Sequence, residues 1–109
     1  MLKKFLTEIY HYFLILRSGF FDRNYYLKTY PDVRKADIDP LWLYIRTGWR
    51  EGRNPSSIFE VSKYLINYPD VAAAQINPII HYIRHGKDEE RNPNPAQSPK
   101  IRIFDLDLA

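Results

Sequence analysis

Apolar residues recur at intervals of three and four along the first part of the chain, over residues 2–17. This spacing predicts an amphipathic helix with one apolar face. Ser18-Gly19 predicts the end of that helix, because glycine tolerates the left-handed conformation that follows a helix C-terminus. The apolar positions are Leu2, Phe5, Leu6, Ile9, Phe13 and Leu16, and the residues mostly opposite are Lys3, Lys4, Thr7, Glu8 and His11.

The next part of the chain is duplicated. Residues 21–55 recur as residues 59–93 at a constant offset of 38, with no insertion, and 18 of the 35 positions are identical. A fixed period of this length is typical of stacked supersecondary units, none of which buries its apolar face alone. The longest matches are Tyr30-Pro31-Asp32-Val33 with Tyr68-Pro69-Asp70-Val71, Tyr44-Ile45-Arg46 with Tyr82-Ile83-Arg84, and Arg53-Asn54-Pro55 with Arg91-Asn92-Pro93.

Capping residues divide the first copy into short helices. Asp22 is a good N-cap for a helix over residues 23–29. Pro31 predicts both the end of that helix and the start of the next, because proline is accepted at a first helical position. Asp39-Pro40 is a second pair of this kind, and it opens an apolar helix that we expect to end at Gly48 with a left-handed cap.

The second copy carries the same signals with a few substitutions. Glu60 or Ser62 takes the N-cap position, Pro69 opens the second helix, and Asn77-Pro78 opens the third. Gly86 is predicted to end the third helix with a left-handed cap. Glu90 stands where the first copy has glycine, so we expect a less tight return loop in the second copy.

These patterns together predict an all-α fold of two tandem 38-residue repeats packed against the N-terminal helix. An extended tail would follow, in which a proline-containing linker leads to alternating apolar and polar residues typical of a strand. The strand-like segment has three interpretations. It pairs with another molecule through residues 100–108, it is a frayed tail, or it is the first strand of a further domain. The expected divisions are 1–19 for the amphipathic helix, 20–57 for repeat 1, 58–95 for repeat 2, and 96–109 for the linker and tail.

The N-terminal helix has two interpretations, which are compatible. It covers the exposed end of the first repeat as a cap, or it rests on an anionic membrane surface with apolar residues inward and lysines outward. Charged residues interrupt its apolar stretch, which is too short to cross a membrane. We therefore expect a cytoplasmic protein, which under the second interpretation is peripheral on the inner membrane. The candidate membrane or partner face comprises Leu2, Lys3, Lys4, Phe5, Ile9 and Phe13.

Composition and charge narrow the function mainly by exclusion. The formal net charge is +3, but basic and acidic residues alternate through both repeats, which argues against a nucleic-acid-binding surface. There is no cysteine, so the chain has no disulfide framework and no thiolate metal site. His81 and His85 have the spacing of metal ligands on a helix, but the chain implies no third ligand. We expect no metal, no cofactor and no catalytic residues in this chain alone.

The return loops share a Glu-x-Arg-Asn-Pro signal at 51–55 and 89–93. The simplest interpretation is structural, with the acid and the arginine paired to each other or to nearby backbone. In the alternative, the arginines are presented at a regular interval to anionic groups, because the guanidinium binds phosphate or carboxylate with two donors.

The series Phe-Asp-x-x-Tyr-Tyr-Leu-x-x-Tyr-Pro-Asp-Val, Ala-x-Ile-Asp-Pro-Leu and Tyr-Ile-Arg-x-Gly-Trp-Arg-Glu-Gly-Arg-Asn-Pro-Ser, at 21–56, resembles a tandem repeat found with glycosyltransferases of bacterial surface-polysaccharide biosynthesis. The resemblance implies a non-catalytic accessory or docking module with a protein partner or an attached glycosyltransferase domain. The alternatives are a small adaptor that dimerises through its C-terminal strand and a carbohydrate-binding module. Candidate glycan or partner contacts are Tyr25, Trp42, Trp49, Arg53 and Arg91.

Overall fold

The computed structural model describes residues 1–95, and this part of the chain is all-α with no strand. The predicted linker and strand-like tail at 96–109, and with them the proposed dimer contact at 100–108, lie outside the described residues. The helices are α1 (Leu2–Ser18), α2 (Arg23–Thr29), α3 (Pro31–Ala36), α4 (Pro40–Arg46), the 3₁₀-helix η1 (Gly48–Glu51), α5 (Val61–Asn67), α6 (Pro69–Ala74), α7 (Pro78–His81) and the π-helical turn η2 (Tyr82–Gly86).

Helices α2 and α3 have the same bounds as α5 and α6 after the offset of 38, and α4 and α7 begin at matching prolines. The predicted caps form where they were expected. Asp22 Oδ1 accepts the Tyr25 backbone N–H at 3.0 Å, and Asp39 caps α4 in the same way. In the second copy Glu60 takes the N-cap position without a side-chain cap, and Asn54 Oδ1 accepts the Val61 N–H instead.

The prediction that Gly48 and Gly86 are left-handed caps was wrong. The glycines with positive φ within residues 1–95 are Gly19, which ends α1 as expected, and Gly52. Gly48 is needed for a different reason: a Cβ at this position would overlap the hydroxyl of Tyr26. A Cβ at Gly86 would lie 2.6 Å from the Tyr64 hydroxyl. In each repeat a buried tyrosine from the first helix therefore packs directly on glycine backbone.

The return loops have the same geometry in both repeats, so the expectation of a less tight second loop was also wrong. Gly52 has φ 77° and Glu90 has φ 58°. The Arg53 N–H donates to the Gly48 carbonyl at 3.0 Å, and the Arg91 N–H donates to the Gly86 carbonyl at 2.8 Å. Glu90 therefore adopts a left-handed conformation that disfavours residues with a Cβ.

Replacing Glu90 with glycine is expected to stabilise the protein by about 0.5 to 1 kcal/mol. The change removes the left-handed backbone cost of about 1 to 2 kcal/mol, and part of this gain is offset by the greater freedom of glycine in the unfolded chain. Urea unfolding followed by circular dichroism measures the difference. The reverse change Gly52→Glu in the first repeat should destabilise, and equal stability of both variants and the wild type would contradict the argument.

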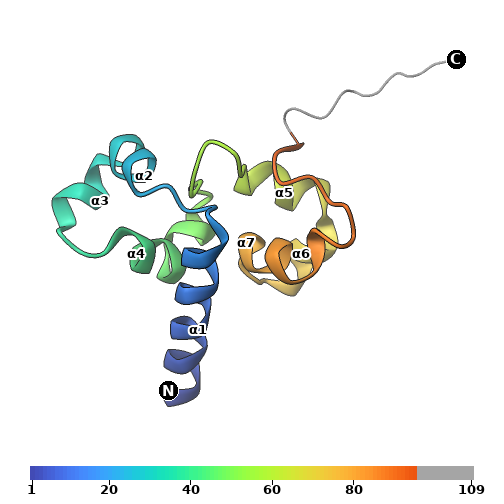
Figure 1. Ribbon diagram of the computed structural model, residues 1–109, viewed down its shortest axis with the longest axis horizontal. Helices are drawn as coiled ribbons and strands as arrows, with labels where there is room; N and C mark the ends of the chain where they lie inside the picture. Colours follow the sequence, from blue (N-terminus) through green and yellow to red (C-terminus); the bar gives the residue numbers. More distant parts are fainter. Residues whose placement is uncertain (96–109) are drawn as a thin grey trace, which may run out of the picture.

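Two groups of short helices flank the C-terminal half of α1 (Figure 1). Helices α2–α4 form one group and α5–α7 the other, and α1 lies against α4 and α7 while its N-terminal turns project from the body. Each repeat closes on itself, because the Asp22 N–H donates to the Pro55 carbonyl and the Glu60 N–H donates to the Pro93 carbonyl. The buried core is Ile15, Tyr26, Val33, Leu41, Tyr44, Ile45, Trp49, Phe59, Val61, Tyr64, Val71, Ile79 and Ile80.

The repeated aromatic residues build this core. Tyr26 lies 5.2 Å from Phe21 and 4.9 Å from Tyr30 between ring centroids, and it meets Tyr44 edge-on at 6.0 Å. The matching rings of the second repeat make the same three contacts around Tyr64. The high tyrosine content of the chain is thus largely a packing feature.

Candidate docking surface

The repeated arginines bind acids of their own repeat. The Arg53 guanidinium makes two bonds to the Asp32 carboxylate, at 3.0 and 2.9 Å, and its Nε lies 3.3 Å from Glu51. Arg91 binds Asp70 with two bonds of 2.9 Å and Glu89 at 2.8 Å. The structural interpretation of the Glu-x-Arg-Asn-Pro signal agrees with this geometry, in which the paired Nη1 and Nη2 donors of each guanidinium already bind a carboxylate.

Tyrosine completes each of these clusters. The Arg53 guanidinium carbon lies 4.7 Å from the Tyr30 ring centroid, and the Tyr30 hydroxyl accepts the Asn54 backbone N–H at 2.8 Å. Tyr68 has the same relation to Arg91, at 4.8 Å, and to the Asn92 N–H, at 2.7 Å. The return loop is thereby fixed to the start of α3 or α6.

Sequence reasoning missed the aspartates as partners of these arginines. A signal was present, because Asp32 and Arg53 are separated by the same 21 residues as Asp70 and Arg91. An opposite charge pair repeated at a fixed separation indicates a contact in a duplicated fold, although these partners lie outside the loop.

Hydrogen bonds from Arg53 and Arg91 lower the pKa values of the Asp32 and Asp70 carboxyls. Since the folded pKa lies below the unfolded value of about 3.9, each pair stabilises the fold fully above that value and loses its contribution as pH falls through the folded pKa. We expect Asp32→Asn/Asp70→Asn to be less stable than wild type at pH 7, with the two converging below about pH 4.

Urea midpoints measured between pH 7 and pH 2.5 test this expectation. Asp37→Asn removes one charge at a left-handed position that asparagine accepts, so it serves as a control for net charge. A stability difference between the double variant and wild type that stays constant with pH would contradict the ion-pair assignment.

The two tryptophans proposed as glycan contacts pack against other residues of the fold. Trp49 is 9% exposed, its Nε1 donates to the Ile45 carbonyl, and Arg50 covers its ring at 4.6 Å. The prediction of Trp49 as an exposed contact was therefore wrong, because its ring is part of the buried core. Trp42 is half-buried and packs against α1 through Phe5 and Tyr12. Tyr25 is half-buried on α2.

Helix α1 is attached to the repeats through one flank. Ile15 is fully buried, and the Tyr12 hydroxyl donates to Asp39, the N-cap of α4. His11 is half-buried, and burial lowers its pKa. The helix thus packs against α4 of the first repeat and α7 of the second, whereas the cap interpretation placed it at the exposed end of the first repeat.

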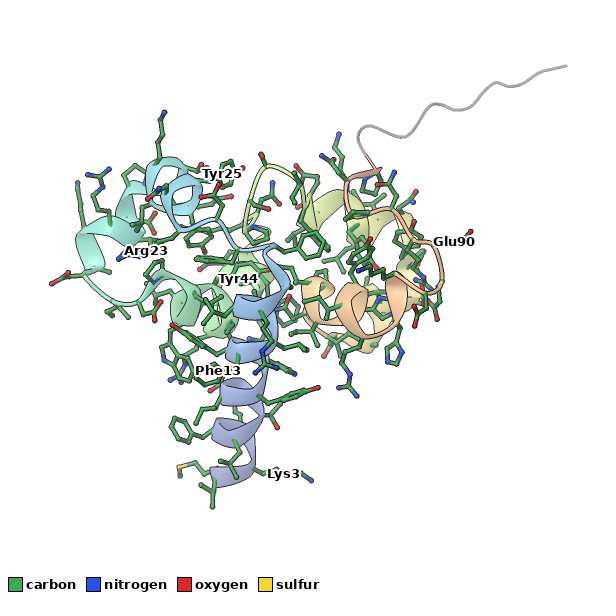
Figure 2. All side chains as sticks on the ribbon, in the orientation of Figure 1. Lys3, Phe13, Arg23, Tyr25, Tyr44 and Glu90 are labelled. Atoms are coloured by element: carbon green, nitrogen blue, oxygen red, sulfur yellow. The ribbon has the colours of Figure 1, made fainter. Side chains whose placement is uncertain are left out.

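The apolar stripe predicted from the sequence is not the buried flank. The side chains of Leu2, Phe5, Leu6, Phe13 and Leu16 are 48–69% exposed, while Ile9 is half-buried. At 100° per residue the centre of this stripe lies about a third of a turn from Ile15. Figure 2 shows Lys3 on the end of α1 that projects from the body and Phe13 nearer to the body. We call this stripe, with Ile9, the α1 face.

Of the two histidines with metal-ligand spacing, His81 is part of the packing and His85 is exposed. His81 is buried, and its Nδ1 lies 3.1 Å from the Tyr64 hydroxyl, while the rings of His81 and His85 are 5.8 Å apart. Residues 1–95 contain no group of three or more histidine or acidic side chains placed to hold a metal ion.

No helix in this part of the chain is long and apolar enough to cross a bilayer.

Comparisons of the chain with protein-family models, with curated proteins and with solved structures found no match. The α1 face is accordingly identified as the candidate site on the physical evidence of the structure.

Proposed function

We propose that this chain is a non-catalytic docking module that serves glycosyltransferases of bacterial cell-surface polysaccharide biosynthesis at the cytoplasmic side of the inner membrane. The α1 face carries the docking part of this proposal, because a contiguous row of large apolar side chains open to water is typical of an interaction surface. The resemblance of the repeats at 21–56 to a glycosyltransferase-associated repeat supports the choice of partner.

The structural roles of the repeated residues support the proposal that the module is non-catalytic. The repeated tyrosines pack in the core, the repeated arginines bind Asp32 and Asp70, and the lack of a Cβ at Gly48 and Gly86 leaves room for tyrosine hydroxyls. Folding therefore accounts for what the duplication preserves. The proposed docking surface lies instead on α1, which is outside the repeats.

The proposal is tested in the source bacterium with the enzyme that shares its reading frame or lies beside it. Deletion of residues 1–95 is expected to lower surface polysaccharide several-fold, while turnover of the purified glycosyltransferase on a soluble acceptor stays unchanged. Unaltered polysaccharide, or the absence of any glycosyltransferase in or next to the frame, would contradict the association. Sugar transfer by the purified chain alone would contradict its non-catalytic role.

A further inference from the structure

The α1 face has a definite charge pattern at its borders. Lys3 and Arg17 follow one edge of the stripe on the helix surface. On the other edge Phe5 and Tyr12 contact Trp42, and the Arg46 guanidinium lies 5.8 Å from the Trp42 ring centroid. Basic side chains therefore border the apolar stripe on both sides.

Glu8, the acid of α1, lies at the border of the stripe that faces the repeats. Glu8 is half-buried and lines one hollow with Leu2, Phe5 and Arg46, and a second hollow with residues of α4 and η1. The borders carry Lys3 and Arg17 on one side and Arg46 beside the single acid Glu8 on the other, so basic charge predominates around the apolar row. Such a face is complementary to a surface with anionic groups above an apolar layer. Lipid headgroups over acyl chains have this arrangement.

A second copy of the chain fits the same face less well. Leu2, Leu6, Ile9, Phe13 and Leu16 alternate at four and three residues, which is the spacing of a coiled-coil seam. The residues that flank this seam on one side are Lys3, Tyr10 and Arg17, with no acid among them. Antiparallel pairing would place Lys3 opposite Arg17 of the other copy, and like charges at these positions oppose association.

We propose that the α1 face binds the surface of an anionic lipid bilayer, with α1 lying in the plane of the interface. The inference rests on the proposed function and names the contact that holds the module in place. At about 1.5 Å per residue, the 17 residues of α1 form a rod of roughly 25 Å. That length lies along a membrane surface with the large apolar side chains at the level of the upper acyl chains.

The test uses the full chain of 109 residues and vesicles of phosphatidylcholine with and without 30% phosphatidylglycerol. Wild-type chain is expected to sediment with the anionic vesicles, about ten-fold less with the neutral ones, and less in 0.5 M salt. The fluorescence of Trp42, which packs on α1, should change on binding. Absence of binding to anionic vesicles, or equal binding to both kinds, would overturn the proposal.

Matched variants separate the face from general hydrophobicity and charge. Leu6→Ser/Phe13→Ser should lower vesicle affinity at least ten-fold, whereas Ile58→Ser/Ile66→Ser, which also removes two exposed apolar side chains, should bind like wild type. Lys3→Gln/Arg17→Gln should lower the preference for anionic lipid several-fold, with Arg46 at the other border still present, in contrast to Lys28→Gln/Lys63→Gln. Circular dichroism checks that each variant is folded, and equal binding of a test pair and its control would overturn the assignment.

Self-association is read in the same samples by sedimentation equilibrium without lipid. A dimer that Leu6→Ser/Phe13→Ser dissociates, together with no vesicle binding, would assign the face to a second copy and overturn the lipid proposal. These experiments contain no glycosyltransferase. If the chain did not bind vesicles, the proposed association with a glycosyltransferase would still stand. If that association were wrong while vesicle binding held, only the bacterial assay would show it.

Discussion

Gly48→Ala is expected to destabilise the protein by about 2 to 3 kcal/mol, although alanine is normally the better residue in helical backbone. The new methyl group would overlap the hydroxyl of Tyr26, which is fully buried. Because Tyr44 also lies 3.4 Å from the same point, the tyrosine ring has little room to withdraw. Chemical denaturation monitored by circular dichroism gives the free energy of unfolding.

Tyr26→Phe should relieve this cost. The Tyr26 hydroxyl is buried and has no hydrogen-bond partner within residues 1–95, so its removal alone is expected to change stability by less than about 1 kcal/mol. With phenylalanine, the nearest ring atom, Cζ, would lie 3.6 Å from the added methyl group, which is an ordinary contact. The double variant Gly48→Ala/Tyr26→Phe should therefore recover most of the loss, with a coupling free energy of about 2 kcal/mol.

Gly19→Ala provides the control for backbone effects. Gly19 has φ 79° and nothing within 4 Å of its added Cβ, so alanine there costs only left-handed strain of about 1 to 2 kcal/mol. Tyr26→Phe should not change that cost. If Gly48→Ala remained equally destabilising with phenylalanine at 26, steric overlap with the hydroxyl would not be its cause.

The sequence predicted the local structure well because its signals act over a few residues. Asp22 bonds to an N–H three positions away, and Pro31 and Pro40 fix the first turns of α3 and α4 by their own φ angle. The helix bounds follow from such short-range preferences. The ion pair between Asp32 and Arg53 joins residues 21 apart, and only the repetition of that separation could have indicated it.

The role of Gly48 was beyond this kind of reasoning. Glycine near a helix end has two uses, a left-handed turn or close approach of another group, and the sequence does not distinguish them. The distinction depends on Tyr26, which arrives from another helix through the packing of the whole repeat. Glu90 shows the converse case, since the fold imposes a left-handed conformation on a residue that disfavours it.

The orientation of α1 was also not readable from its period. A stripe at 3.6-residue spacing shows that one side of a helix is apolar and does not show what covers that side. Here the flank bearing Tyr12 and Ile15 makes the specific contacts, through the bond to Asp39 and a fully buried side chain. The more hydrophobic side of α1 is left exposed. The apolar stripe, whose partner the sequence could not indicate, is therefore a candidate docking site.

Ile15→Ala is expected to cost about 2 to 5 kcal/mol, whereas the neighbouring Leu16→Ala should change stability by less than about 0.5 kcal/mol. Both substitutions remove an aliphatic side chain from the last turns of α1. Ile15 is fully buried, and Leu16 is 55% exposed on the α1 face. If the apolar stripe held the helix to the repeats, the order of the two effects would be reversed.

Urea unfolding measures the two free energies, and amide hydrogen exchange locates the effect. Ile15→Ala should raise exchange in α1 and at its contacts with α4 and α7, because these helices pack together. Leu16→Ala should leave protection unchanged in the repeats while weakening attachment of α1 to anionic vesicles. We therefore expect Ile15→Ala to lower stability and the adjacent Leu16→Ala to lower vesicle binding, because one side of α1 packs on the repeats and the other side is left free to bind.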